Sequence, residues 1–577
     1  MLDAASNCGI SYIFGNLGTD HVSIIEGLAA GRERGSDLPR MIIAPHENVA
    51  VHMAGGYALA TGAGQMVLVH VDAGTANAAL AMHNLFRTRV PVMLVAGRAP
   101  YSSRGDLRGS RDAYVQFVQD PFDIRALVRP YVKWEYDLPS GQVAAEAVTR
   151  AHTIMQSDPM GPVYMTAARE MLAEEFELPD SHASAKRSAV VKARGLDPDT
   201  TERIANDLMA AEEPLAITGY LGRNPGACAT LTELAETCAL RVAEFNPTHL
   251  NISRDSPFWA GSQPQSAMDG VDLGLLLDVD VPFIPKFSPL ANEIRWIHLD
   301  IDPIKRDLPM WDFPVDFGAQ ADCNVALRQI VDIVRAKGAS DFHERTRARR
   351  ARLEREAAER RKGLESASGQ TGAVDAIAPE YVCWALNRRL STKDVIVNEA
   401  IRNMTNVLER IPRTAPGTYF SDGGGGLGFS GGVALGLKLA WPDRRVVQIV
   451  GDGVFHFCNP DSVYAAAARY GLPIFTVVLD NGGWQAVKES VRRVYPNGAA
   501  ERVNEFYAVL GGDRQGETRR FDLVAEAFGA HGELVRDPAA LDDAITRCLA
   551  ALEAGRSAVM HVRIMPLSPS TQTVRSL

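Results

Sequence analysis

Two neighbouring strand ends in the last third of the chain carry residues suited to holding a metal ion and a diphosphate. The stretch 445–450 is typical of a buried strand and ends in Gly451-Asp452-Gly453, and a second strand over 473–479 ends in Asp480-Asn481-Gly482-Gly483. Asp452 supplies a carboxylate and Asn481 an amide oxygen, while the glycines let backbone groups come close to a ligand. Mg²⁺ prefers such oxygen atoms together with phosphate oxygens. The pattern therefore predicts a magnesium-diphosphate site.

This pattern resembles the metal motif of the thiamine-diphosphate (ThDP)-dependent enzyme superfamily, a Gly-Asp-Gly followed by Asn-Asn or Asp-Asn. The resemblance implies that Asp452 and Asn481 bind magnesium through their side chains and Gly483 through its carbonyl. Gly451 and Gly453 would lie beside the cofactor. The pair begins with Asp480 rather than the commoner Asn, which we expect to be tolerated because the metal contact belongs to the second position.

A second acid is required in the first third of the chain if the resemblance holds. In the family, a carboxylate beside N1′ of the aminopyrimidine lets the 4′-amino group remove the C2 proton. Glu47 follows a strand-like run over 41–44 and opens an apolar helix containing Ala54-Gly-Gly-Tyr-Ala58, a family pattern. Without the rest of the pattern, Glu47 would equally be interpreted as an acid at a helix N-terminus that the helix dipole favours. In this context we interpret Glu47 as the catalytic acid.

A glycine-rich turn over 419–429 precedes an apolar helix over 431–440. By resemblance, Leu427 would wedge between the two cofactor rings, and the Gly425 carbonyl would receive the 4′-amino group. Glu399 ends a strand near the expected diphosphate site and is a further candidate cofactor contact.

The first block resembles benzoylformate decarboxylases and acetolactate synthases. Phe14–Thr19 is similar to their Phe-Gly-Asn-Pro-Gly-Ser/Thr turn, and His70–Asn77 to the His-x-x-Ala-Gly-Thr-x-Asn of the former. The resemblance implies that His70 faces the thiazolium and moves protons, and that Thr19 binds a substrate oxygen. The alternative for His70 is a hydrogen-bonded histidine at a strand end.

Departures from these families leave the substrate open. No histidine lies between His249 and His298, where benzoylformate decarboxylase uses a second one from its middle domain. On the helix expected over 484–490, Trp484 and Val487 should wall the substrate pocket, and Val487 replaces the glutamate of pyruvate decarboxylases. Glu489 is expected to be a surface acid, with a proton relay as the alternative.

Short apolar strands alternate with helical stretches, which predicts the α/β class with parallel sheets. We expect three doubly wound domains: pyrimidine-binding (1–176), central (190–345) and diphosphate-binding (365–577). The polar stretches 178–187 and 366–379 are predicted linkers, and the charged run 343–362 a solvated connecting helix, since its Arg and Glu interleave at helical spacings. Two further segments, 493–519 and 568–577, are candidate lids.

The central block has no Gly-x-Gly-x-x-Gly turn, and Gly219-Tyr-Leu-Gly222 is too sparse to assign a nucleotide. Asp300 and Asp302 resemble the strand end of acetolactate synthases where a nucleotide binds or is absent. FAD, ADP and no ligand therefore all stay open.

Composition excludes several classes of protein. The 577 residues include seven scattered cysteines without a Cys-x-x-Cys pair, and the net charge is −10. The negative net charge disfavours nucleic-acid binding. The scattered cysteines disfavour a disulfide framework and a zinc site. No run reaches the roughly 18 apolar residues of a membrane span, and the start lacks a secretory signal, so we expect a cytoplasmic protein with no membrane partner.

The leading hypothesis is a ThDP- and Mg²⁺-dependent carbon–carbon lyase or carboligase that decarboxylates a 2-oxo acid or ligates it as acetolactate synthases do. The alternatives are a 2-hydroxyacyl-CoA lyase, an FAD-linked oxidase of the pyruvate oxidase type, and a catalytically silent scaffold that binds cofactor. Because Glu47 and the metal motif lie on different domains, the family arrangement implies that they meet across the subunit interface of a homodimer or homotetramer.

Overall fold

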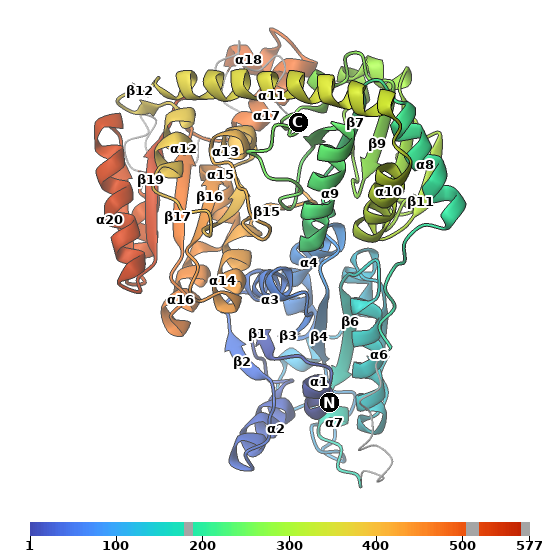
Figure 1. Cartoon of the computed structure of the whole chain (residues 1–577). Helices are drawn as coiled ribbons and strands as arrows, with labels where there is room; N and C mark the ends of the chain where they lie inside the picture. The colour runs from blue at the N-terminus through green and yellow to red at the C-terminus, as the bar shows by residue number, and fades with distance from the viewer. Residues whose placement is uncertain (178–188, 504–518, 567–577) are drawn as a thin grey trace.

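The computed structural model describes residues 1–177, 189–503 and 519–566. Three parallel sheets with flanking helices follow one another along the chain, and the first and third lie against each other through helices (Figure 1). The α/β fold class is therefore confirmed. Each sheet lies inside one of the three predicted domain ranges, and the domain boundaries themselves stay predictions.

The first sheet has six parallel strands in the order β2-β1-β3-β4-β6-β5. They are β1 (Tyr12–Gly15), β2 (Arg40–Ile43), β3 (Gln65–Val69), β4 (Val92–Arg98), β5 (Glu135–Leu138) and β6 (Val163–Ala168). Its helices are α1 (Leu2–Asn7), α2 (Val22–Glu33), α3 (Glu47–Thr61), α4 (Val71–Arg87), α5 (Val115–Val118), α6 (Ala144–Gln156) and α7 (Arg169–Leu172).

The third sheet repeats this topology, in the order β15-β14-β16-β17-β19-β18. Its strands are β14 (Val395–Glu399), β15 (Tyr419–Ser421), β16 (Val446–Gly451), β17 (Phe475–Asp480), β18 (His531–Val535) and β19 (Ala558–Arg563). Its helices are α12 (Pro379–Asn387), α13 (Met404–Arg410), α14 (Ser430–Ala440), α15 (Asp452–Phe457), α16 (Pro460–Tyr470), α17 (Gln485–Val494), α18 (Ala499–Val503), α19 (Phe521–Glu526) and α20 (Leu541–Glu553).

The central sheet has five parallel strands in the order β11-β10-β9-β7-β8. They are β7 (Pro214–Thr218), β8 (Arg241–Glu244), β9 (Leu273–Leu277), β10 (Arg295–Asp300) and β11 (Phe317–Gln320), with helices α8 (Pro198–Ala210), α9 (Pro225–Cys238) and α10 (Cys323–Lys337). The strands predicted from apolar runs all form, with ends that differ by one or two residues, because fully buried parallel strands need apolar side chains on both faces.

The charged run forms most of α11 (Ser340–Ser368), which joins the central and third domains along one side of the molecule (Figure 1). The expected connecting helix is confirmed and most of its side chains are exposed, but one side of it is buried. Leu353 and Ala357 are buried, and so is Arg349, which donates to the carbonyl oxygens of Cys238 and Ala239 at the end of α9. The predicted linker 366–379 contains a small hairpin of β12 (Gly372–Ala373) and β13 (Ala376–Ile377). The linker predicted over 178–187 lies outside the described residues.

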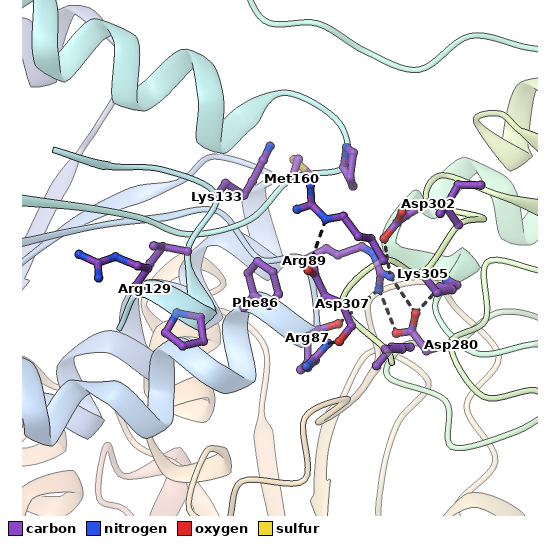
Figure 2. Close-up of a pocket in the computed structure, with 16 residues that line it drawn as sticks. Phe86, Arg87, Arg89, Arg129, Lys133, Met160, Asp280, Asp302, Lys305 and Asp307 are labelled. Carbon is purple, nitrogen blue, oxygen red and sulfur yellow. Dashed lines mark hydrogen bonds and ion pairs between the residues drawn. The ribbon is translucent and has the colours of Figure 1, made fainter. Parts of the chain in front are cut away.

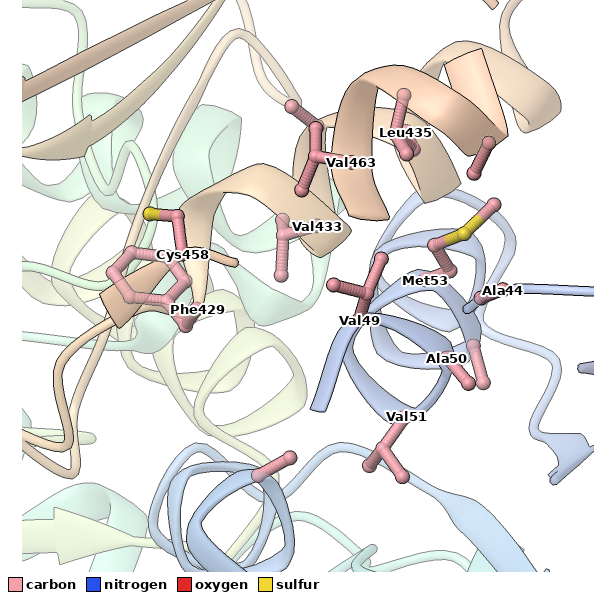
Figure 3. Close-up of a cluster of buried hydrophobic side chains, with 14 of the residues drawn as sticks. Ala44, Val49, Ala50, Val51, Met53, Phe429, Val433, Leu435, Cys458 and Val463 are labelled. Atoms are coloured by element: carbon pink, nitrogen blue, oxygen red, sulfur yellow. The ribbon is translucent and has the colours of Figure 1, made fainter. Parts of the chain in front are cut away.

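The first and third domains are joined by the packing of α3 against α14, and Figure 3 shows the apolar side chains between them. Two glycines permit this close approach. A Cβ on Gly56 would lie 2.3 Å from the Val433 carbonyl oxygen, and one on Gly436 would lie 2.1 Å from the Met53 carbonyl oxygen. Any side chain at either position would push the helices apart.

Two features bear on location and redox state. All seven cysteines lie within the described ranges and are free thiols. Among the helices of those ranges, none has the length and apolar character that a membrane crossing requires.

Candidate active site

Asp452 and Asn481 are brought together because β16 and β17 pair in parallel, with Gly451 beside Leu479. Both side chains are buried, at 2% and 7% exposure. Among the described residues, neither Oδ2 of Asp452 nor Oδ1 of Asn481 has a hydrogen-bond partner. Buried oxygens without a donor are costly, so these two atoms fit the ligand positions of a cation.

A guanidinium lies at this position. Arg519 Nη1 is 3.8 Å from Asp452 Oδ2, and its Nη2 is 3.2 Å from Asp480 Oδ1. The arginine stands in for positive charge at the point where the motif would hold Mg²⁺. Burial raises the pKa of the Asp452 carboxyl, and the neighbouring Asp480 carboxylate raises it further. The residues present therefore fit a divalent cation. Its charge would stabilise ionised Asp452 against both burial and the repulsion of Asp480.

The unusual Asp480 is held by other groups. Its Oδ2 accepts from His561 Nε2 at 2.9 Å and lies 3.2 Å from Arg563 Nη1, and its Oδ1 accepts from the Gly482 amide at 3.0 Å. Burial opposes its ionisation, yet these partners and Arg519 lower the pKa of Asp480. Protein donors therefore hold the carboxylate of Asp480, which agrees with the expectation that an aspartate is tolerated at this position. Gly483 follows at φ 132°, a backbone conformation that glycine favours.

Glu47 begins α3 as a buried acid with two amide donors. Asn16 Nδ2 donates to its Oε1 at 3.3 Å, and Asn77 Nδ2 donates to its Oε2 at 3.0 Å. His46 caps the helix by accepting the Asn48 amide at 3.1 Å. Because the donors are neutral, the carboxylate is oriented while its charge is left uncompensated. The two amides fix the position of the Glu47 carboxylate in the first turn of α3.

His70 ends the next strand and is bound to an acid. Its Nδ1 lies 2.6 Å from Asp20 Oδ1, and Asp20 Oδ2 accepts the Val71 amide at 3.3 Å. The Asp20 hydrogen bond raises the pKa of His70, against the lowering effect of burial. Thr19 and His70 line the same small cavity, of about 10 Å³, which is room for roughly one water molecule.

The turn expected to carry Leu427 contacts the first domain within this single chain. Asn84 Nδ2 donates to the Gly426 carbonyl at 2.8 Å, and the Gly426 amide donates back to Asn84 Oδ1 at 3.1 Å. Asn84 lies two turns after Asn77 on α4, so one helix face contacts both Glu47 and this turn. The first and third domains therefore contact each other at this turn, and the expected meeting of Glu47 with the metal motif across a subunit interface stays a prediction.

A cavity of about 440 Å³ opens beside this turn and is lined by Glu399, Gly425 and Leu427. Its other walls are largely apolar: Phe245, Val281, Ile284, Ile401, Met404, Leu408 and Phe429. Glu399 accepts from the Gly428 amide at 2.6 Å and from the Ser430 amide at 3.0 Å, so its carboxylate anchors the turn. Burial raises the pKa of Glu399 to about 7.

The helix α17 lies at the edge of this region. Trp484 is 37% exposed with its ring 6.1 Å from that of Phe457, and Val487 is 44% exposed. The expectation that Glu489 is a surface acid is wrong, because it is 5% exposed and pairs with Arg402, which lines the 440 Å³ cavity. Their separation by 87 residues hides this pair from sequence reasoning.

In the central domain, a cavity of about 570 Å³ lies against the first domain (Figure 2). Asp302 lines it, whereas Asp300 is buried and engaged by protein donors, accepting from Tyr220 Oη at 2.5 Å and from Lys305 Nζ at 2.8 Å. Arg89 of the first domain forms two hydrogen bonds to Asp280, at 2.8 and 3.0 Å. Much of the charge at this strand end is thus paired within the protein.

The candidate lids fall mostly outside the described residues: 504–518 of the segment 493–519, and all of 568–577. Sequence reasoning missed Asp20, Asn77, Asn84 and Arg519 as supporting residues. Asp20 directly follows Thr19, and Asn77 closes the quoted His70 motif, so a search for polar neighbours of the motif residues would have found both.

Three α/β domains, with a metal-and-diphosphate motif on the third and a buried glutamate on the first, define a ThDP-dependent enzyme. The chain belongs to this family: residues 1–126 match the thiamine pyrophosphate enzyme N-terminal TPP binding domain, and residues 403–562 match the C-terminal TPP binding domain.

Proteins similar to the chain include decarboxylases and acetolactate synthases. It is 25% identical over 498 residues to benzoylformate decarboxylase of Pseudomonas aeruginosa, covering 83% of this chain and 85% of that protein. It is 23% identical over 544 residues to acetolactate synthase isozyme 3 large subunit of Escherichia coli, covering 91% and 88%. The fold matches that of a thiamine diphosphate-dependent 4-hydroxybenzoylformate decarboxylase from Rhodococcus jostii, with TM-score 0.78, 21% identity and 98% of both chains covered.

Proposed function

We propose that the protein is a ThDP- and Mg²⁺-dependent carbon–carbon lyase or carboligase that acts on a 2-oxo acid, by decarboxylation, by ligation as in acetolactate synthases, or by both. The observation that carries the proposal is the pair of buried oxygens on Asp452 and Asn481, which accept no hydrogen bond from the described residues. In the described part of the chain, no group of three His, Cys, Asp or Glu forms a self-sufficient metal site. A cation here would need further ligands, and a diphosphate supplies them.

Asp452, Asn481 and the Gly483 carbonyl would hold the metal and through it the diphosphate, with Gly451 and Gly453 beside them. Leu427 and Gly425 would hold the ring end, and Glu399, which anchors the same turn, would be a further cofactor contact. When bound, ThDP supplies a nucleophilic carbon that adds to a carbonyl group and accepts the electrons of the broken bond.

The chain's own residues would place and move protons. Glu47, oriented by Asn16 and Asn77, would hold the proton shared with the aminopyrimidine. His70, whose pKa is raised by its hydrogen bond to Asp20, would donate to a substrate oxygen or carbon, with Thr19 on the same wall. The apolar walls of the 440 Å³ cavity, together with Trp484 and Val487, would exclude water.

Oligomerisation is part of the proposal. Segment 101–122 at the edge of the first sheet exposes large apolar side chains, among them Tyr114 and Phe117. Gln116 and Gln119 of the same segment line the cavity of His70. Exposed apolar patches mark interaction surfaces. We infer that a second copy covers this segment in a homodimer or homotetramer of the reducing cytoplasm, with the His70 side of the site at the interface.

The test is to incubate the protein with ThDP, Mg²⁺ and a panel of aliphatic and aromatic 2-oxo acids, and to identify products by mass spectrometry. Release of the aldehyde, or of a 2-hydroxy ketone, that depends on both additions supports the proposal. Turnover of 2-hydroxyacyl-CoA esters alone, or no turnover of any 2-oxo acid, contradicts it.

A further inference from the structure

A separate cavity of about 220 Å³ lies where the central domain, the connecting helix and the third domain meet. Its walls come from the loop 254–259, the last turns of α11, the end of α12 and the end of α13. The motifs described above contribute nothing to its lining in the described ranges. Its position between two domains makes it a place where a ligand would contact both.

The walls carry more positive than negative charge. Five arginines and three acidic residues line the cavity within the described chain. Arg360 lies with its guanidinium carbon 5.2 Å from the ring centre of Trp259, and Arg388 lies 4.6 Å from that of Trp384. Cations held over aromatic faces beside a cavity are suited to a ligand that is both flat and anionic.

Arg254 gives the strongest indication of a ligand. Its side chain is fully buried, and only its Nε is bonded, to Glu244 Oε2 at 2.8 Å. Trp259 Nε1 and Asn251 donate to the same carboxylate. The Arg254 guanidinium lies over the Tyr419 ring at 4.1 Å, but its Nη1 and Nη2 find no acceptor in the described part of the chain. Buried guanidinium groups are normally hydrogen-bonded through these atoms.

The cavity shares one helix with the lining of the larger cavity beside Leu427. The helix α13 is a wall of both: Met404 and Leu408 line the 440 Å³ cavity, and Glu409 and Arg410 line this one. Ser262, which lines the larger cavity, also donates to Glu409 Oε1 at 3.5 Å. A ligand that moved Glu409 would therefore change the neighbouring wall.

We propose that this cavity is a second ligand site, which binds a small aromatic carboxylate. The two terminal nitrogens of Arg254 would take the carboxylate as a bidentate pair, and Trp259 and Trp384 would cover the ring. Binding would reach the larger cavity through Glu409 on α13. Binding of the carboxylate does not depend on the proposed function, whereas its effect on turnover rests on that function.

The direct test is diffraction from crystals of the full chain soaked in 4-bromobenzoate. An anomalous bromine peak between Trp259 and Trp384 supports the site. A peak only beside Leu427, or no peak, overturns it.

In solution, benzoate binding is measured by calorimetry. The Arg254→Met variant should weaken it by about tenfold to a hundredfold, since hydrogen bonds to charged groups are among the strong ones. Arg388→Met, at an exposed position, should weaken it severalfold even if the first variant folds poorly. Arg389→Met is the matched control, because Arg389 is its exposed neighbour outside the cavity lining of the described residues, and it should bind benzoate as the wild type does. Equal affinity in Arg388→Met and the wild type contradicts the site.

The coupling is tested separately with a 2-oxo acid found to be turned over. Benzoate should change kcat in the wild type and not in Arg254→Met. Purely competitive inhibition that is the same in both proteins contradicts the coupling. Failure of the protein to turn over any 2-oxo acid would count against the proposed function and leave the diffraction result to decide the site.

Discussion

The first and third domains share one topology but treat their acids in opposite ways. Their sheets have the same strand order, so the ends of corresponding strands can be compared. After the second strand come Glu47 in one domain and the Leu427 turn in the other, and after the third come His70 and Asp452. The corresponding helices α3 and α14 pack against each other and bring the two domains together.

The difference lies in the donors around each acid. Glu47 receives two neutral amide donors, whereas Asp452 keeps an oxygen without a partner and faces a guanidinium. Two amides hold the Glu47 carboxylate in place, whereas the unpartnered oxygen of Asp452 fits the ligand position of a cation. On the proposed function, the same fold would supply one proton site and one metal site.

The largest effect is expected from Glu47→Gln, which removes the proton site and keeps the shape. Exchange of the cofactor's C2 proton, followed by NMR in deuterated buffer, should slow by about a hundredfold to ten-thousandfold, while ThDP binding stays within a few-fold. Glu26→Gln, an exposed acid on α2, is the control. Exchange at the wild-type rate in Glu47→Gln would contradict the assignment of the proton site to the first domain.

The second prediction concerns the acid that accompanies His70. Asp20 raises the pKa of His70, so activity that needs the protonated ring persists below this raised pKa and is lost as pH rises through it. In Asp20→Asn the loss should begin at lower pH, and a shift of about one unit lowers the alkaline rate about tenfold. The profile of kcat/KM against pH measures this, with exposed Asp106→Asn as control. An unchanged profile would show that the pair has no role in proton transfer.

The third prediction tests the pairing of corresponding helices. Gly436→Val would place a side chain against the Met53 carbonyl and should lower the free energy of unfolding by about 1–3 kcal/mol, as overpacking does. Urea denaturation checks it. Gly363→Val in α11, where a Cβ meets nothing within 4 Å, controls for the loss of glycine in a helix. Equal midpoints for the two variants would contradict the close packing.

The smallest effect is expected at Arg519, which stands at the cation position. Arg519→Met should tighten Mg²⁺ binding in the presence of ThDP by roughly twofold to fivefold, because it removes a competing cation that lies 3.8 Å from Asp452 Oδ2, beyond hydrogen-bond distance. Calorimetric titration measures it, and Arg520→Met, whose partner is Asp522, is the matched control. Weaker Mg²⁺ binding would mean that Arg519 supports the bound cofactor instead of holding its place.

Strand ends and motif residues could be predicted because they are local. Apolar runs that end in glycine and acid predict the strands over 445–450 and 473–479, and β16 (Val446–Gly451) and β17 (Phe475–Asp480) lie within two residues of them. The closeness of Asp452 and Asn481 follows from the parallel pairing of two strands that are joined by a helical connection.

Partners from distant segments could not be predicted. The Glu489–Arg402 pair depends on how α17 lies over the third sheet, and the Asn84–Gly426 contact joins residues 342 positions apart. The interleaved Arg and Glu of α11 predict a helix, but not that Arg349 reaches carbonyl oxygens at the end of α9. Such contacts are fixed by domain packing, which no local pattern encodes.

The most direct test is calorimetric titration of ThDP into the metal-free protein, with and without Mg²⁺, for the wild type and Asp452→Ala. The wild type should bind one cofactor per chain only when Mg²⁺ is present, and the variant should give no measurable heat. Binding by the variant with wild-type affinity, or no binding by the wild type, would contradict the assignment of the cation site to the third domain.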